Sequence, residues 1–263
     1  MPPSDDRIDL RATFDEVAEL YDRARPGYPP EVFDDLVSLA ALGLGSRMLE
    51  IGCGTGQATV PLVERGLDLT CVELGESLAA VARRRLAGRA EVVVGDFEVW
   101  EPERADFDAV VAFTAFHWLH PTERFEKSVR LLGGGGHLCV VATRHVLPAG
   151  GDPFWVEVQE DYDAVVPDPA NRAPDPPEEV PDLSAEFAAS GCFEDVVVRR
   201  YVWDVEYTPD TYIDVLETYS GHRSMEPAKR GQLYERIRRR IESRPGARVY
   251  KSHLAMLHVA RRR

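Results

Sequence analysis

Five apolar runs that alternate with helix-like segments constrain the fold more than any other feature of this sequence. The runs are predicted β-strands, at 47–52, 67–74, 90–96, 107–114 and 136–143. Predicted helices separate them at 57–66, 76–88 and 121–133. Strands that are apolar almost throughout are covered on both faces, and in α/β chains they pair in parallel. The alternation predicts an α/β fold with a doubly wound, mostly parallel sheet.

The segments on either side of this core extend the prediction. Helices are expected at 10–24 and 31–42, and the proline-rich stretch 25–30 breaks the chain between them. The second half is predicted to hold a proline-rich lid or loop at 148–182, a helix at 183–191, a long strand at 193–208, helices at 209–219 and 227–243, and a last, antiparallel strand at 248–262. The late strands complete a sheet of seven.

The charge of the chain argues against a nucleic-acid partner. There are 31 Lys and Arg residues against 45 Asp and Glu, which gives a formal net charge of −14. The basic runs are short. Leu233, directly before the longest of them (234–244), and Ile237 and Ile241 within it recur at helical spacing. The arginines of this run are therefore interpreted as the solvated face of an amphipathic helix rather than as a phosphate-binding stripe.

Other classes of protein are disfavoured by what the sequence lacks. The four cysteines, at 53, 71, 139 and 192, have no Cys-x-x-Cys spacing, so neither a disulfide framework nor a zinc site is predicted. No acidic cluster follows the fourth strand, and we expect no metal. No apolar run approaches a membrane span, and the acidic start MPPSDDRIDL is not a secretory signal. We expect a cytoplasmic protein without a membrane partner.

A glycine-rich turn directly after the first strand predicts a ligand site. The sequence MLEIGCGTGQAT, 48–59, places Gly52, Gly54 and Gly56 at alternate positions. Glycine permits positive φ and close backbone approach, and ligands of open parallel sheets lie beyond the carboxyl ends of the strands. A P-loop is excluded because Gln57 and Ala58 stand where Lys and Ser or Thr are needed. A dinucleotide fingerprint lacks its third glycine, since Gln57 occupies that position.

The turn and the segments after it resemble one family. LEIGCGTGQAT closely resembles the first motif of class I S-adenosylmethionine-dependent methyltransferases, and the resemblance continues in register through CVELGES, VVGDFEVW, FDAVVAFTAFHWLHP and LLGGGGHLCVV. In the last of these, glycines replace the Lys and Pro of the family's Leu-Lys-Pro-Gly-Gly turn. The segment FDEVAELYDRARPGYP also resembles the cap of a small-molecule subgroup that includes trans-aconitate methyltransferase-like enzymes. The clear match covers about 10–145.

This resemblance implies S-adenosylmethionine as the cofactor. Glu73 would bond the ribose hydroxyls, with a helix N-cap as the alternative role. Asp96 would bond the adenine amine, or else only form a turn. Arg25 would bond the methionine carboxylate, or else be a surface arginine. Glu50 would lie near the methionine end, or be paired inside its strand. The predicted cofactor-binding residues are Tyr21, Arg25, Glu50, Gly52, Cys53, Gly54, Thr55, Gln57, Glu73, Leu74, Asp96, Phe97, Phe113 and Thr114.

The loop after the fourth strand would lie beside the transferred methyl group. His117 is the candidate general base, because its ordinary pKa suits proton removal near neutral pH; the alternative is that it only packs or bonds backbone. The predicted substrate-binding residues are Tyr28, Trp118, Arg144, His145, Tyr219, His222 and Arg223. Two arginines and two histidines that converge would suit a carboxylate or another anionic acceptor.

The sequence thus predicts one methyltransferase domain over 1–263, with a helical cap at 1–45, a cofactor-binding core at 46–145, and at 146–263 an insertion that completes the sheet. The expected reaction is in-line methyl transfer to a small molecule, assisted mainly by proximity. Two alternatives stay open at this point. One is a non-catalytic or regulatory S-adenosylmethionine-binding protein, and the other is a protein or RNA methyltransferase.

Overall fold

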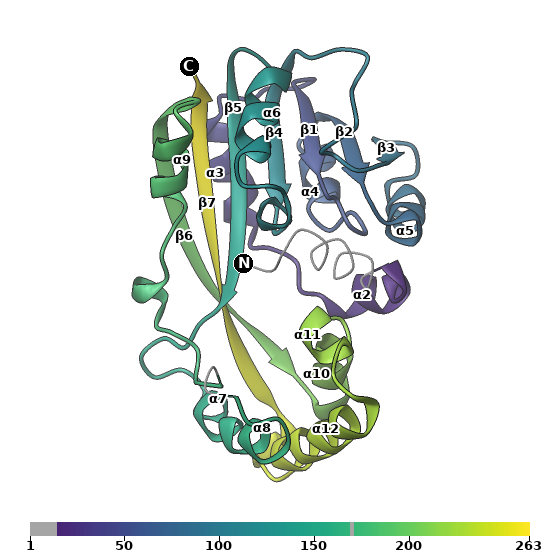
Figure 1. The fold of residues 1–263 in the computed structure, drawn as a ribbon, viewed down its shortest axis with the longest axis vertical. Helices are drawn as coiled ribbons and strands as arrows, with labels where there is room; N and C mark the ends of the chain where they lie inside the picture. The colour runs from purple at the N-terminus through teal and green to yellow at the C-terminus, as the bar shows by residue number, and fades with distance from the viewer. Residues whose placement is uncertain (1–14, 169–170) are drawn as a thin grey trace.

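A mixed seven-stranded sheet organises the computed structural model, which describes residues 15–168 and 171–263 (Figure 1). Within these residues the strands are β1 (Arg47–Ile51), β2 (Asp68–Glu73), β3 (Glu91–Val94), β4 (Phe107–Phe113), β5 (Leu132–His145), β6 (Phe193–Tyr207) and β7 (Val249–Arg262). Their order is β3-β2-β1-β4-β5-β7-β6, and β7 runs antiparallel to both of its neighbours. The predicted fold class is confirmed.

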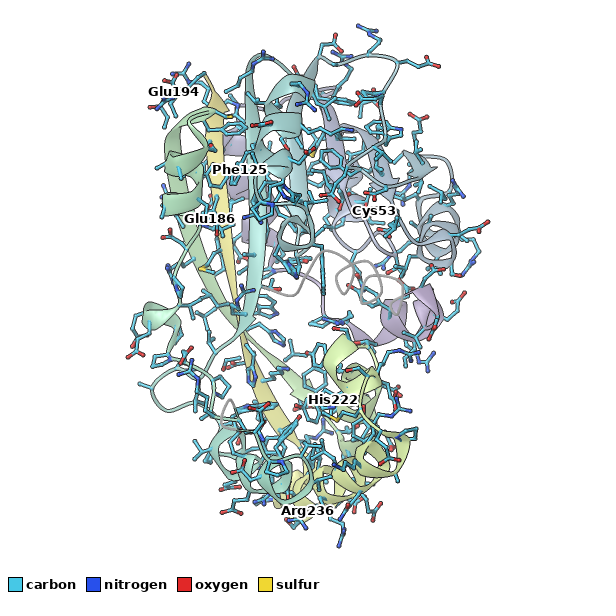
Figure 2. All side chains as sticks on the ribbon, viewed as in Figure 1. Cys53, Phe125, Glu186, Glu194, His222 and Arg236 are labelled. Carbon is cyan, nitrogen blue, oxygen red and sulfur yellow. The ribbon has the colours of Figure 1, made fainter. Side chains whose placement is uncertain are left out.

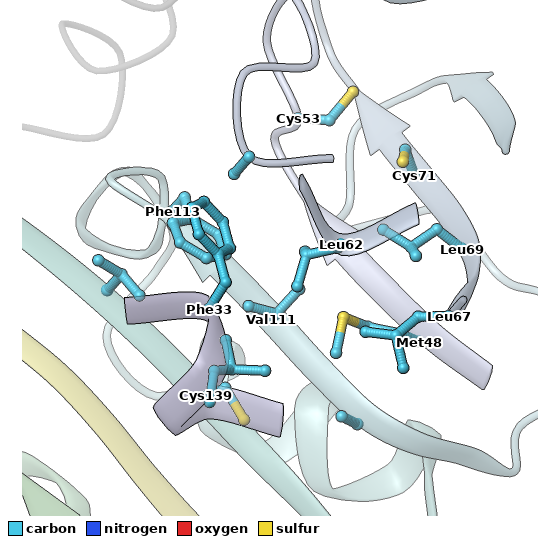
Figure 3. Packing of buried hydrophobic residues seen from close by; sticks show 14 of the residues in the cluster. Phe33, Met48, Cys53, Leu62, Leu67, Leu69, Cys71, Val111, Phe113 and Cys139 are labelled. Carbon is cyan, nitrogen blue, oxygen red and sulfur yellow. The ribbon is translucent and has the colours of Figure 1, made fainter. Parts of the chain in front are cut away.

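Helices cover both faces of the sheet, as the apolar strands require. One face packs against α3 (Pro30–Leu39), α4 (Thr59–Glu64) and α5 (Glu76–Leu86), and the other packs against α6 (Glu123–Leu131) and α9 (Ser184–Ser190). Neighbouring residues of β1 show the alternation, because Met48 joins the first core and Leu49 the second. Figure 3 shows part of the first core, where Phe33 stacks on Phe113 at a centroid distance of 5.4 Å.

Three long strands continue past the helical layers and carry a second body of helices, here called the lobe (Figure 1). The lobe consists of α7 (Phe154–Glu157), α8 (Gln159–Val165), α10 (Pro209–Leu216), α11 (Ser220–Arg223) and α12 (Pro227–Glu242). It has its own buried core, to which Trp155, Tyr212 and Ile237 contribute. The helix α2 (Ala18–Ala24) lies between the lobe and the carboxyl edge of the sheet, and short 3₁₀ turns occur at η1 (Phe116–Trp118), η2 (Pro177–Glu179) and η3 (Pro245–Ala247).

Several element boundaries differ from the sequence prediction. The helix expected at 57–66 spans only Thr59–Glu64, with Ala58 as its N-cap. The helix expected at 209–219 ends at Leu216, so Tyr219 precedes the next helix as its N-cap. The stretch 148–182 is not a plain loop, since it contains α7 and α8. Part of the helix expected at 10–24 lies outside the described residues.

The described helices include none with the length and apolar character needed to cross a membrane. The arginines of the predicted amphipathic helix, now α12, are engaged in ion pairs. Asp161, which is buried, pairs with both Arg236 and Arg240 at 3.1 and 2.5 Å, and Arg238 pairs with Asp210 at 2.6 Å. Because acidic partners already neutralise these arginines, α12 does not present a free basic stripe.

Candidate active site

The glycine turn after β1 has the backbone geometry that its sequence predicts. Gly52, Gly54 and Gly56 have φ angles of +65°, +56° and +86°, in the left-handed region that favours glycine. A Cβ atom on Gly52 would lie 2.8 Å from the Cβ of Ala115, on the loop after β4. Glycine at 52 therefore allows two loops to approach each other at the carboxyl edge of the sheet.

Glu73 ends β2 and fixes the turn to the neighbouring strand. Its Oε2 accepts a hydrogen bond from the Gly54 amide at 2.8 Å, and its Oε1 accepts one from the Gly75 amide at 2.9 Å. The side chain is buried, yet it lines a cavity above the sheet edge. A carboxylate that faces a cavity is a suitable acceptor for the two hydroxyls of a ribose.

A first cavity of about 290 Å³ lies directly over the glycine turn and the end of β2. Of the predicted cofactor-binding residues, those that line it are Tyr21, Arg25, Gly52, Gly54, Glu73, Leu74, Phe97, Phe113 and Thr114. Five predicted residues do not line it. Cys53 and Thr55 are buried behind the turn, and Gln57 lines the second cavity described below. The side chains of Asp96 and Glu50 make the contacts given in the next paragraphs.

Asp96 takes part in a local turn, and its role toward adenine stays a prediction. Its Oδ1 accepts a hydrogen bond from the Glu98 amide at 3.0 Å, two residues further along the chain. The residues on either side of it, Gly95 and Phe97, line the first cavity. The end of β3 therefore reaches the cavity as predicted, but its backbone and the Phe97 ring form the wall.

Glu50 is a buried carboxyl group directly behind the glycine turn. Its residue is only 1% exposed, and within the described part of the chain its Oε1 has no hydrogen-bond partner. The Cys71 thiol lies 3.8 Å from the other oxygen. Burial raises the pKa of Glu50 to about 7, against the opposing influence of the Thr59 and Cys71 side chains. Burial thus favours the protonated form of this group at a higher pH than for an exposed Glu.

A second cavity, of about 440 Å³, joins the first and extends between the sheet edge and the lobe. Five residues line both cavities, and this set is here called the junction: Tyr21, Arg25, Thr114, His117 and Tyr219. His222, which belongs to the lobe, lines the second cavity. Figure 2 shows His222 below Cys53, which lies in the glycine turn. A ligand in the first cavity and a ligand in the second would therefore meet at the junction.

Local contacts hold the junction in place. The Arg25 guanidinium donates to the hydroxyl of Thr218 at 2.8 Å and to its carbonyl at 2.9 Å, and it stacks over the Tyr219 ring at 4.4 Å. Thr114 has a φ of +54°, and its hydroxyl is hydrogen-bonded to Tyr28 at 2.9 Å and to Thr143 at 3.0 Å. Such a backbone conformation costs about 1–3 kcal/mol outside glycine and is typical of functional sites.

His117 lies on η1 at the junction, where a general base would be needed. Desolvation, together with the positive charges of Arg144 and Arg124, lowers its pKa to about 4. The imidazole is therefore neutral at pH 7, which is the form that accepts a proton. The low pKa also makes it a weak base, so its catalytic role stays a prediction.

The predicted substrate-binding residues do not all converge. Tyr28, Arg144, His145, Tyr219 and His222 line the second cavity, and Trp118 lines the first. Arg223 lines neither, because α11 is a single turn that directs its side chain to an ion pair with Glu16. The expected convergence of Arg144 with Arg223 is therefore wrong.

Sequence reasoning missed several residues of the second cavity. They are Tyr162, Tyr212, Lys251 and His253. A partial signal for two of them was present, because Lys251 and His253 are polar residues at i and i+2, directly before the apolar run 254–257 of the same strand. Such residues share one side of a strand, but nothing in the sequence alone indicates that this side faces a cavity.

Comparisons with known proteins find methyltransferases and agree with this fold. Residues 48–136 match a family model described as a methyltransferase domain. An uncharacterized methyltransferase of Mycobacterium tuberculosis is 36% identical over 135 residues, which are 51% of this chain and 54% of that protein. One from Geobacillus kaustophilus is 32% identical over 139 residues, 49% of this chain and 65% of that protein. The chain spans about half the length of the first of these relatives.

Solved structures show the same fold at low sequence identity. The YcgJ protein of Bacillus subtilis has a TM-score of 0.53 and 15% identity over 89% of this chain and 98% of its own. Phosphoethanolamine N-methyltransferase 2 of Haemonchus contortus, in complex with S-adenosyl-L-methionine, has a TM-score of 0.52 and 19% identity over 94% of this chain and 57% of its own. Both likenesses concern the fold.

Fold and glycine turn together define a Rossmann-like protein with a ligand at the carboxyl edge of its sheet. Residues 48–136 carry a methyltransferase domain, and the fold and the glycine turn agree with the resemblance of this region to the class I S-adenosylmethionine-dependent methyltransferases. S-adenosylmethionine is accordingly its cofactor, as the sequence predicted. The likeness of the N-terminal cap to trans-aconitate methyltransferase-like enzymes stays a prediction.

Proposed function

We propose that this protein transfers the methyl group of S-adenosylmethionine to a small anionic molecule held in the second cavity. The observation that carries the proposal is the junction. A cofactor in the first cavity, with its ribose on Glu73, would direct its reactive end toward residues that also line the second cavity. An open space of about 440 Å³ next to that end favours an enzyme over a module that only binds the cofactor.

The charge of the second cavity supports an anionic acceptor. Its lining includes Arg25, Arg144 and Lys251, and the described residues that line it include no Asp or Glu. This is the reverse of the whole chain, whose formal net charge is −14. A concave site lined by one sign of charge attracts ligands of the other sign.

A small molecule is favoured over a macromolecule by the shape of the site and by one relative. The second cavity lies between the lobe and the sheet edge, and the arginines of α12 are paired with acids, which disfavours RNA. Demethylmenaquinone methyltransferase of Renibacterium salmoninarum, whose name specifies a small acceptor, is 28% identical over 181 residues, 64% of this chain and 74% of that protein. The cytoplasmic location and the division at 45 and 145 remain predictions.

In this mechanism the chain supplies alignment and exclusion of water. S-adenosylmethionine supplies an electrophilic methyl group on a sulfonium. Glu73 would hold the ribose. Tyr21, which lies on α2, and Arg25, directly after it, would close over the rest of the junction. Thr114 and Tyr28 would orient the acceptor through their hydroxyls. Positioning of this kind can by itself account for much of the acceleration in a displacement reaction.

Calorimetric titration with S-adenosylhomocysteine tests the cofactor half of the proposal. We expect the wild type to bind one equivalent, and Glu73→Ala to bind at least tenfold more weakly, which is about 1.4 kcal/mol. The substitution removes the ribose acceptor and the carboxylate that holds the Gly54 amide. Glu91→Ala, on the exposed start of β3, is the matched control and should bind like the wild type. Equal affinities for Glu73→Ala and the wild type would contradict the assignment.

A further inference from the structure

Lys251 is a buried cation without an acidic partner. It lies on β7, lines the second cavity and is only 3% exposed. Its Nζ donates a hydrogen bond to the Tyr219 hydroxyl at 3.0 Å and lies 5.5 Å and 5.8 Å from the ring centroids of Trp155 and Tyr212. Throughout 15–168 and 171–263, no carboxylate forms an ion pair with it. A buried ammonium is costly unless it is paired.

The second buried lysine of the chain shows how this fold ordinarily satisfies such a charge. Lys127 is 1% exposed, and its ammonium contacts the carbonyl oxygens of Glu98 and Trp100 and the carboxylate of Glu101 at 3.2 Å. Lys251 has aromatic rings and one phenol in place of these oxygens. Lys251 lines a cavity that is large enough for a ligand, and such a ligand would supply the oxygen acceptors that the protein does not provide.

Two histidines beside Lys251 also lack hydrogen-bond partners. His145 on β5 and His253 on β7 are register partners, and both line the second cavity. The Nε2 atom of each is buried and unpaired among the described residues. Burial, together with the charge of Lys251, lowers the pKa of His145 to about 2 and that of His253 to about 3. Both rings are therefore neutral at pH 7 and can each donate one N–H.

We propose that Lys251, His145 and His253 form a subsite that binds a carboxylate of the methyl acceptor. The inference rests on the proposed function and specifies the class of its substrate. One cation flanked by neutral donors matches the single charge of a carboxylate. None of the three residues lines the first cavity. The carboxylate is therefore an anchor, and the atom that receives the methyl group is another atom of the acceptor, closer to the junction.

Benzoate is a suitable probe, since aromatic side chains surround the subsite. We would titrate benzoate and its neutral isostere benzamide into protein saturated with S-adenosylhomocysteine. The wild type is expected to bind benzoate at least tenfold more tightly than benzamide. Lys251→Met should bind benzoate at least tenfold more weakly than the wild type. Lys229→Met, on the exposed surface of α12, is the matched control and should equal the wild type.

The outcomes separate this inference from the proposed function. Wild type that binds S-adenosylhomocysteine but does not prefer benzoate to benzamide overturns the subsite and leaves the cofactor assignment intact. Equal benzoate affinity for Lys251→Met and the wild type also overturns it, as does tighter binding of inorganic phosphate than of benzoate. If Lys251→Met does not fold, the comparison of benzoate with benzamide on the wild type still decides. A wild type that does not bind S-adenosylhomocysteine would instead refute the proposed function.

Discussion

Replacing Gly52 with valine is expected to weaken the binding of S-adenosylhomocysteine by a factor of a hundred or more, about 2.8 kcal/mol. Gly52 has a φ of +65°, which a β-branched residue adopts only with strain, and a Cβ atom there would lie 2.8 Å from the Cβ of Ala115. Either the glycine turn or the loop after β4 must move. Both line the first cavity, so either movement distorts the site.

Gly134→Val is the matched control for this substitution. Gly134 lies on β5, and nothing lies within 4 Å of a Cβ atom built there. We expect this variant to bind S-adenosylhomocysteine like the wild type, with a change in unfolding free energy within about 0.5 kcal/mol. Calorimetric titration and urea unfolding of both variants provide the measurement. Gly52→Val that binds with wild-type affinity would show that the turn does not approach the ligand.

The second large effect concerns the pH dependence of stability and Glu50. Its pKa is raised from 4.5 to about 7 in the folded protein, mainly by burial. Between these values the unfolded chain releases the proton that the folded protein keeps, so the free energy of unfolding falls as the pH rises. Over this interval the loss is about 3 kcal/mol, at 1.36 kcal/mol per pH unit.

Glu50→Gln should remove this dependence, because the amide does not ionise. Relative to the wild type without ligand, the variant is expected to gain about 3 kcal/mol of unfolding free energy between pH 4.5 and pH 7.5. Urea unfolding of both proteins across this range measures the difference. A difference that stays constant with pH would show that Glu50 ionises normally in the folded state. Glu91→Gln, at an exposed position, controls for the loss of a carboxylate elsewhere.

How much of this structure the sequence predicts depends on whether the interacting residues are close together or far apart along the chain. The strands of the core were predictable because each is an apolar run between turn residues. The position of Glu73 followed from its place at the end of such a run, since parallel strands bring their carboxyl ends to one edge. The glycine turn was predictable for the same reason, together with its residue spacing.

Residues of the second cavity were harder to predict because they come together only through long-range packing. Lys251 and His253 reach the cavity because β7 pairs with β5 and extends into the lobe, which the local pattern does not reveal. Arg223 was misplaced because the helix expected at 209–219 breaks after Leu216 and redirects the chain. Asp96 accepts a local hydrogen bond from the Glu98 amide, as an Asp at the end of a strand often does, and its role toward the cofactor stays a prediction.

Transfer of a labelled methyl group tests the central claim most directly. The protein would be incubated with S-adenosylmethionine tritiated on its methyl group and a cell extract that contains small molecules, proteins and RNA. Label in the small-molecule fraction, greatly reduced with Glu73→Ala, is the predicted result, and labelled products should include carboxylic acids methylated at another atom. Label in the protein or RNA fraction instead, or no transfer by a wild type that binds the cofactor, would contradict the account.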